Sequence, residues 1–179
     1  MIYVALLRGI NVGGKTKVDM KLLKTTFEQL GFEKVKTYIN SGNVIFEATS
    51  VSPKQLTATL ESAIEKDFGF AVPVVVRDLL AIKTIVEALP DNWTNDQTMK
   101  CDVMFLWPEI DNPKIMEQIP HKPEIEDVKY LPGTLFWRID RDKVNRGQVL
   151  KIIGTGVYKQ MTVRNCNTVR KLYALMVNA

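Results

Sequence analysis

The chain has 179 residues, of which 46% are hydrophobic and 25% are charged, and its formal net charge is +4. This length suits one domain or two small ones, and the composition is that of a globular protein rather than a disordered one. No apolar run approaches the roughly 18 residues that a membrane helix needs. The sequence also begins without a charged leader, so we expect a cytoplasmic protein with no membrane segment.

Cysteine and histidine are scarce in this sequence. Cys101 and Cys166 lie far apart along the chain. We expect both to stay reduced thiols, and a single disulfide between them is the alternative. His121 is the lone histidine, and one histidine cannot build a metal site by itself. We therefore expect no metal and no cofactor.

Positive charge is concentrated at the C-terminal end. Residues 141–179 hold eight Lys or Arg and one acid, whereas residues 109–127 hold six acids and two bases. This distribution has three explanations: an anionic partner, contact between the basic end and the acidic stretch, or simply solvated helix faces.

The pattern of residues 1–77 predicts a ferredoxin-like half with the element order β-α-β-β-α-β. Asp19 is the expected N-cap of the first helix, which Gly31 ends. Ser52 and Gln55 form a capping box for the second helix. Apolar strands are expected at 2–7, 35–39, 44–46 and 72–76.

A second α+β half is predicted over residues 101–179, after a connecting helix and linker at 78–100. A helical pattern at 148–160 is weakened by Gly154 and Gly156. Strands are expected at 102–107, 128–131, 135–139 and 161–163, a short helix at 113–119, and a terminal helix capped by Asn165 or Asn167. The predicted fold class is therefore α+β, with two ferredoxin-like (βαββαβ) halves, antiparallel sheets and a C-terminal helix.

A glycine-rich loop follows the first strand, and Gly9 to Thr16 matches the phosphate-loop pattern G-x-x-x-x-G-K-[ST]. Three features argue against nucleotide hydrolysis. The helical pattern begins several residues too late, the next two strands form a hairpin, and no strand ends in a convincing magnesium ligand. Arg8, Lys15 and Lys17 around the loop amides still suit a bound anion. The alternative is a structural turn in which Asn11 bonds its own backbone.

A second cluster, Asn40 to Asn43, reads Asn-Ser-Gly-Asn and suits a hairpin turn. We expect the end of the first strand to lie beside the far end of the third strand, near Phe46. The turn is then expected at the opposite edge, so that it joins the glycine loop in one site only if the second half bridges them.

The third cluster, Met161 to Thr168, precedes the last helix. A helix N-terminus carries unpaired N–H groups and a partial positive charge. The last helix contains no acid, and Arg164, Arg170 and Lys171 surround its start. This arrangement favours a bound anion. Simple capping by an asparagine is the alternative.

Three stretches, LLRGINVGGK at 6–15, TYINSGNVIF at 37–46 and MTVRNCNTVRKL at 161–172, resemble the bacterial family called domain of unknown function 1697. The resemblance covers essentially the whole chain. It implies a cytoplasmic protein of two α+β halves, and it implies no established activity. Its motif positions map onto Arg8, Gly9, Asn11, Gly13, Gly14, Ser41, Gly42, Asn43, Arg164, Asn165, Asn167 and Thr168.

These patterns favour a protein that binds an anionic ligand, namely a phosphorylated metabolite, a nucleotide or a nucleic acid. One alternative is an enzyme acting on a phosphorylated or amide substrate, with Asn and Arg side chains stabilising negative charge. Another is a structural or interaction protein whose motifs shape turns and the interface between the halves. The expected ligand-binding residues are Arg8, Asn11, Gly13, Gly14, Lys15, Ser41, Asn43, Arg164, Asn165, Asn167 and Thr168.

Overall fold

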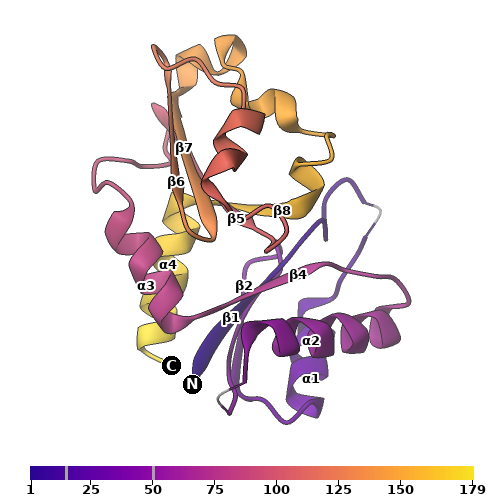
Figure 1. The fold of residues 1–179 in the computed structure, drawn as a ribbon. Helices are drawn as coiled ribbons and strands as arrows, with labels where there is room; N and C mark the ends of the chain where they lie inside the picture. The colour runs from indigo at the N-terminus through magenta and orange to yellow at the C-terminus, as the bar shows by residue number, and fades with distance from the viewer. Residues whose placement is uncertain (15, 50) are drawn as a thin grey trace. The chain divides into compact units, whose positions relative to one another are not determined.

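The computed structural model describes residues 1–14, 16–49 and 51–179 (Figure 1). Its described chain forms two units, one made of Met1–Lys83 with Leu172–Ala179 and the other of Thr84–Lys171. Each unit carries a four-stranded antiparallel sheet. The predicted α+β class, with two halves of βαββαβ-like order and a C-terminal helix, is confirmed. The division into 1–77, 78–100 and 101–179 stays a prediction.

The helices are α1 (Met20–Gln29), α2 (Pro53–Phe68), α3 (Leu79–Ala88) and α4 (Cys166–Val177). The strands are β1 (Ile2–Leu7), β2 (Glu33–Tyr38), β3 (Asn43–Glu47), β4 (Val74–Asp78), β5 (Met99–Leu106), β6 (Glu126–Leu131), β7 (Thr134–Asp140) and β8 (Met161–Asn165). Short 3₁₀ segments are η1 (Pro113–Gln118), η2 (Arg141–Arg146), η3 (Val149–Ile152) and η4 (Tyr158–Gln160).

The first sheet has the strand order β2-β3-β1-β4, and a hydrophobic core joins it to α1 and α2 (Figure 1). The local signals for these helices act as predicted. Asp19 accepts hydrogen bonds from the first backbone N–H groups of α1, and Ser52 with Gln55 completes the capping box of α2. Phe27 from α1 and Leu60 from α2 are fully buried in this core. The core therefore fixes β1 at the centre of the unit.

The first two motifs meet within this unit, so the expectation that they lie at opposite edges is wrong. Leu6 pairs with Asn43 in the β1–β3 ladder, and the Leu7 N–H donates to the Gly42 carbonyl at 2.8 Å. Antiparallel neighbours run in opposite directions, so the end of β1 lies beside the beginning of β3 rather than beside its end near Phe46.

The second sheet has the order β6-β7-β5-β8. The hairpin of β6 and β7 turns at Pro132-Gly133, between the two strands predicted at 128–131 and 135–139, with Gly133 at φ 89°. The helix expected at 148–160 does not form. The chain instead makes η3 and η4 around Gly154, whose φ of 87° ends the helical conformation. None of the described helices is both long enough and apolar enough to cross a membrane.

Candidate functional site

Asn11 holds the glycine loop together with its side chain. Its Oδ1 accepts the Val18 N–H at 2.9 Å, while its Nδ2 donates to the Val18 carbonyl at 3.1 Å and to the Asn40 carbonyl at 2.9 Å. These bonds close the loop and fasten it to the hairpin turn. Asn11 therefore has a structural role in the loop, but its side chain bonds the backbone of Val18 and Asn40 rather than its own.

The hairpin turn is also held internally. Asn43 is fully buried, and its Nδ2 donates to the Tyr38 carbonyl and to Ser41 Oγ, each at 3.0 Å. The loop and the turn border an open hollow of about 420 Å³ lined by Asn11, Gly14, Lys17, Val18, Asp19 and Asn40. Lys15 lies outside the described residues. Anion binding by Arg8, Asn11, Gly13, Gly14, Lys15, Ser41 and Asn43 stays a prediction.

The phosphate-loop interpretation finds no support in this geometry. A phosphate loop leads directly into a helix and belongs to a parallel sheet. Here α1 begins only at Met20, after its N-cap Asp19, and the sheet is antiparallel. The loop is therefore a different kind of strand-to-helix connection.

The third motif fastens the start of α4 to the segment before β5. Asn165 is the helix cap, because its Oδ1 accepts the Thr168 N–H at 2.9 Å. Asn167 instead forms two hydrogen bonds with the backbone of Asn95. Its Nδ2 donates to the Asn95 carbonyl at 2.8 Å, and its Oδ1 accepts the Asn95 N–H at 3.4 Å. Arg170 donates to two further carbonyls of the same segment. The motif thus positions residues 90–95.

Arg164 is buried rather than open to solvent. It is 7% exposed, and its Nη1 donates to Thr162 Oγ1 at 3.0 Å and to the Val163 carbonyl at 2.8 Å. Burial lowers the pKa of Arg164 to about 10, so it remains charged at neutral pH. Its predicted role in binding an anion stays a prediction, as does that of Thr168.

Cys101 and Cys166 are buried free thiols. Cys101 directly precedes Asp102 and Cys166 directly follows Asn165, and the pairing of Asp102 with Asn165 in the antiparallel β5–β8 ladder brings the two sulfur atoms together. The hydrogen bond with Cys166, together with burial, raises the pKa of Cys101. Among the described residues, no group of three His, Cys, Asp or Glu side chains is placed to hold a metal ion.

A pocket of about 330 Å³ opens on one face of the second sheet. Successive side chains of a strand point to opposite faces, so Lys100, Asp102 and Met104 of β5 share the face that the pocket occupies. Asn165 of β8 lines the same face, and the chain from η3 to η4 forms the facing wall. The remaining lining residues are Asn95, Arg141, Val149, Leu150, Ile152, Ile153, Tyr158 and Val163.

Two cationic side chains line this pocket. Lys100 Nζ lies 3.0 Å from Asp102 Oδ2, in a partly buried ion pair. The Arg141 guanidinium donates from Nε to the Asp96 carbonyl and from Nη2 to Asn95 Oδ1, the second bond being 3.2 Å long. Asn95 Oδ1 also accepts the N–H of Cys101 at 3.4 Å. One oxygen atom therefore brings the guanidinium to the backbone of β5 beside Asp102.

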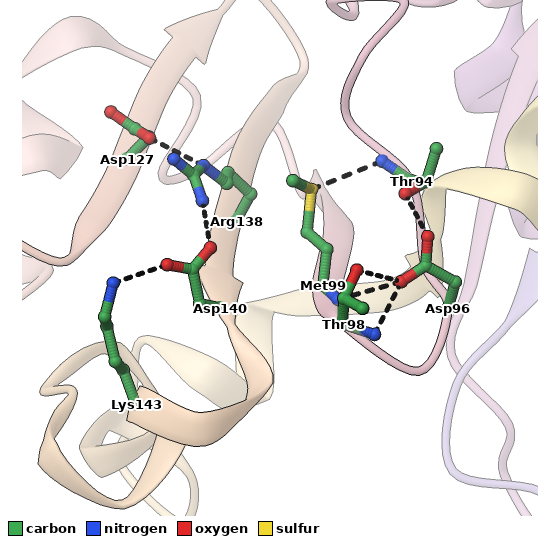
Figure 2. Close-up of polar contacts among 8 residues, drawn as sticks. All are labelled: Thr94, Asp96, Thr98, Met99, Asp127, Arg138, Asp140 and Lys143. Carbon is green, nitrogen blue, oxygen red and sulfur yellow. Dashed lines mark hydrogen bonds and ion pairs between the residues drawn. The ribbon is translucent and has the colours of Figure 1, made fainter.

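Figure 2 shows two polar clusters, one around Asp96 in the turn before β5 and one around Asp140 at the end of β7. Asp96 accepts hydrogen bonds from the hydroxyls of Thr94 and Thr98 and from the backbone N–H groups of Thr98 and Met99. These bonds lower the pKa of Asp96 well below its ordinary value. They hold the turn whose backbone carbonyl receives the Arg141 guanidinium.

The second cluster in Figure 2 joins the end of β7 to Asp127 of β6 and Lys143 of η2. Arg138 bridges Asp127 and Asp140 at 2.8 and 2.7 Å, and Lys143 reaches the other oxygen of Asp140 at 2.5 Å. The Lys143 ammonium is the main cause of the lowered pKa of Asp140. These ion pairs hold the end of β7, and therefore the position of the Arg141 backbone that follows it.

A buried carboxylate anchors the pocket wall. Glu126 is 2% exposed, and its Oε2 accepts the N–H groups of Lys122 and Gln148 at 2.8 and 2.9 Å. Its Oε1 accepts the N–H of Val149 at 3.0 Å. Burial opposes ionisation of this group, but the three N–H groups outweigh it and lower the pKa of Glu126. The beginning of η3 is thus tied to the edge of the sheet.

Among the predicted ligand-binding residues, Asn165 lines the pocket and Asn167 positions Asn95, which also lines it. The sequence did not indicate the charged lining residues, Lys100, Asp102 and Arg141. The alternation of Lys100, Asp102 and Met104 along an otherwise apolar strand was a usable signal, because polar residues on one face of a buried strand need partners there.

Two antiparallel four-stranded sheets of repeated strand order, each with its own core, define an α+β protein built from two related units. The chain belongs to the family described as "Protein of unknown function (DUF1697)", whose family model matches residues 1–137. The resemblance to domain of unknown function 1697 is thereby confirmed. The matched range includes the first two motifs and β5, whereas the third motif lies beyond it.

Among solved structures, the chain is similar to the conserved bacterial protein SP0830 from Streptococcus pneumoniae. The two share 29% sequence identity with a TM-score of 0.83, and the match covers 98% of each chain. The likeness therefore extends over both units. No curated protein matches this chain.

Proposed function

We propose that the second unit binds a small anionic metabolite through a carboxylate or phosphate group. The observation that carries this proposal is that Arg141 and Lys100 line one pocket of about 330 Å³. Ligand pockets in proteins typically enclose about 300–1,000 Å³, so this one suits a small molecule rather than a polymer.

Arg141 is well placed to hold an anion because its geometry is already fixed. A guanidinium carries several N–H donors in a rigid fork that matches carboxylate and phosphate oxygens. The contacts with Asp96 and Asn95 engage Nε and Nη2 and hold the plane of this fork. A side chain that is ordered before binding loses less conformational freedom when the ligand arrives.

The third motif supports the same proposal indirectly. Asn167 holds Asn95, and Asn95 holds Arg141. The basic C-terminal part of the sequence thus contributes one cation, Arg141, to the pocket. In this proposal the start of α4 builds the pocket, and the ligand need not contact the helix N-terminus itself.

Isothermal titration calorimetry and thermal-shift measurements test the proposal. The panel of compounds is phosphate, pyruvate, 4-methylpentanoate, glucose 6-phosphate and AMP. A ligand that binds only the folded state raises the melting temperature. The variants Arg141→Ala and Lys100→Ala each remove one cation from the pocket. Arg146→Ala is the matched control, because Arg146 is an exposed arginine on the same 3₁₀ segment that does not line the pocket.

A charge-assisted hydrogen bond contributes about 1.5–3 kcal/mol, so Arg141→Ala is expected to weaken binding by about 10- to 100-fold. Arg146→Ala is expected to leave the affinity unchanged. The proposal fails if no compound with a carboxylate or phosphate group binds, L-leucine included, or if a bound compound tolerates the loss of both pocket cations.

A further inference from the structure

We infer that the ligand of this pocket is an α-amino acid with an apolar side chain, its carboxylate held at Arg141 and its ammonium group at Asp102. This inference rests on the proposed function, because it takes Arg141 as the anion-binding group. It adds a second charged group of opposite sign and an apolar portion to the ligand.

Asp102 places a negative charge in a pocket that is proposed to hold an anion, and its ion pair with Lys100 engages one of the two pocket cations. It is 7% exposed and faces the pocket from β5. A buried carboxylate beside the binding site repels an anion, and such a repulsive element selects against ligands that carry negative charge alone. A ligand that also carries a positive group converts this repulsion into attraction.

The Asp102 carboxylate has capacity for such a group. In the described part of the chain its one charged partner is Lys100, 3.0 Å from Oδ2. An ionised carboxylate has two oxygens and about four lone-pair sites. A ligand ammonium can therefore donate to Asp102 while the ion pair with Lys100 persists.

Asp102 and Arg141 line the same pocket and are linked through Asn95. Asn95 Oδ1 accepts hydrogen bonds from both Arg141 and the N–H of Cys101, the residue next to Asp102. The amino and carboxylate groups of an α-amino acid are carried by the same carbon atom, so their binding groups must also be close. Asn165, which pairs with Asp102 across the β5–β8 ladder, adds an amide at the same place.

The rest of the pocket suits an apolar side chain. Aliphatic and thioether groups from the sheet and from the wall line it: Met104, Val149, Leu150, Ile152, Ile153 and Val163. Tyr158 is the lining residue that combines an aromatic ring with a hydroxyl. The pocket thus combines positive and negative side chains with an apolar wall. This is the lining expected for an amino acid with a branched or unbranched aliphatic side chain.

Calorimetry with three ligands of one carbon skeleton tests this inference. L-Leucine carries both charged groups, 4-methylpentanoate lacks the amine, and isoamylamine lacks the carboxylate. With the wild-type protein, leucine is expected to bind at least tenfold more tightly than either analogue. With Asp102→Asn, leucine is expected to lose at least tenfold in affinity, while 4-methylpentanoate binds as well as before or better.

Asp142→Asn is the control, since Asp142 is an exposed acid on η2 that does not line the pocket. Thermal unfolding of each variant verifies that it is folded at the titration temperature. If 4-methylpentanoate binds the wild type as tightly as leucine, the amino-acid inference is overturned and the anion-binding proposal survives. Tight binding of phosphates with no binding of leucine also overturns the inference alone. If no anion and no amino acid binds, both fail.

Discussion

Replacing Glu126 by glutamine is expected to destabilise the second unit while leaving its hydrophobic core intact. Both oxygens of Glu126 accept backbone N–H groups, two on Oε2 and one on Oε1. Glutamine has nearly the same shape, but one of its terminal atoms is an NH₂ donor. Whichever way the amide is oriented, a donor then faces a donor at the base of the pocket wall.

The size of this effect follows from the bonds that change. Loss of one charge-assisted hydrogen bond costs about 1.5–3 kcal/mol, and a buried donor left without an acceptor costs about 1–3 kcal/mol. Because the amide relaxes partly, we expect a loss of about 3 kcal/mol in the free energy of unfolding. For a chain of this size that corresponds to a fall of about 6–12 °C in the melting temperature.

The effect is also expected to depend on pH in a defined direction. The folded state lowers the pKa of Glu126, so its stabilising contribution is fully present above the unfolded glutamate pKa of about 4.3. As the pH falls through the lower folded pKa, the wild-type side chain becomes protonated and resembles glutamine. The difference in stability between wild type and Glu126→Gln is therefore expected to shrink below about pH 4.

Urea denaturation at pH 7 and at pH 3, followed by circular dichroism, measures both quantities. Glu124→Gln is the matched control, because Glu124 is exposed two residues away in the same segment. We expect this control to change stability by less than about 0.5 kcal/mol, as surface substitutions usually do. The reasoning is refuted if Glu126→Gln is as stable as the control at pH 7, or if its deficit is unchanged in acid.

Three further substitutions probe the supports of the loops. Gly147→Ala places a Cβ 2.6 Å from Glu126 Oε1, and this overpacking is expected to cost about 1–3 kcal/mol in denaturation experiments, whereas Gly156→Ala, with open space around it, is expected to cost far less. Asn167→Ala removes the bonds to Asn95 and is expected to weaken ligand binding in calorimetry; unchanged affinity would show that Arg141 needs no such support. Asn11→Ala loses three hydrogen bonds at a φ of 54°, so we expect a loss of about 1–3 kcal/mol, and a smaller loss for Asn11→Gly, since glycine accepts that backbone conformation.

Local signals in the sequence predicted the helices and strands of the first unit well. Asp19 begins α1, and the Ser52–Gln55 box begins α2. Each of these signals acts over a few neighbouring residues, so it can be recognised from the sequence alone. The prediction failed at 148–160, where repeated glycines and the tie to Glu126 replaced a helix with two short 3₁₀ segments.

The site was less predictable, because its groups come from distant parts of the chain. Asn11 and Asn43 were identified as important, and their hydrogen bonds show that they hold the loop and turn in shape. Asn167 was predicted as a possible cap of the last helix, but its side chain bonds the backbone of Asn95. The sequence alone did not indicate that Asn167 and Asn95 are partners.

The sequence by itself determined the α+β class, the order of elements and the three motifs, because propensity, capping and hydrophobic periodicity act between neighbours along the chain. The tertiary structure decided which polar residues share a pocket. Arg141 and Asn95 are separated by 46 residues, and they meet only because β5 and β7 pair in the sheet. The register of that ladder places Asp102 opposite Trp137, and the register of the β5–β8 ladder places it opposite Asn165. Such a register is set by the packing of the whole sheet, so no local stretch of sequence contains it.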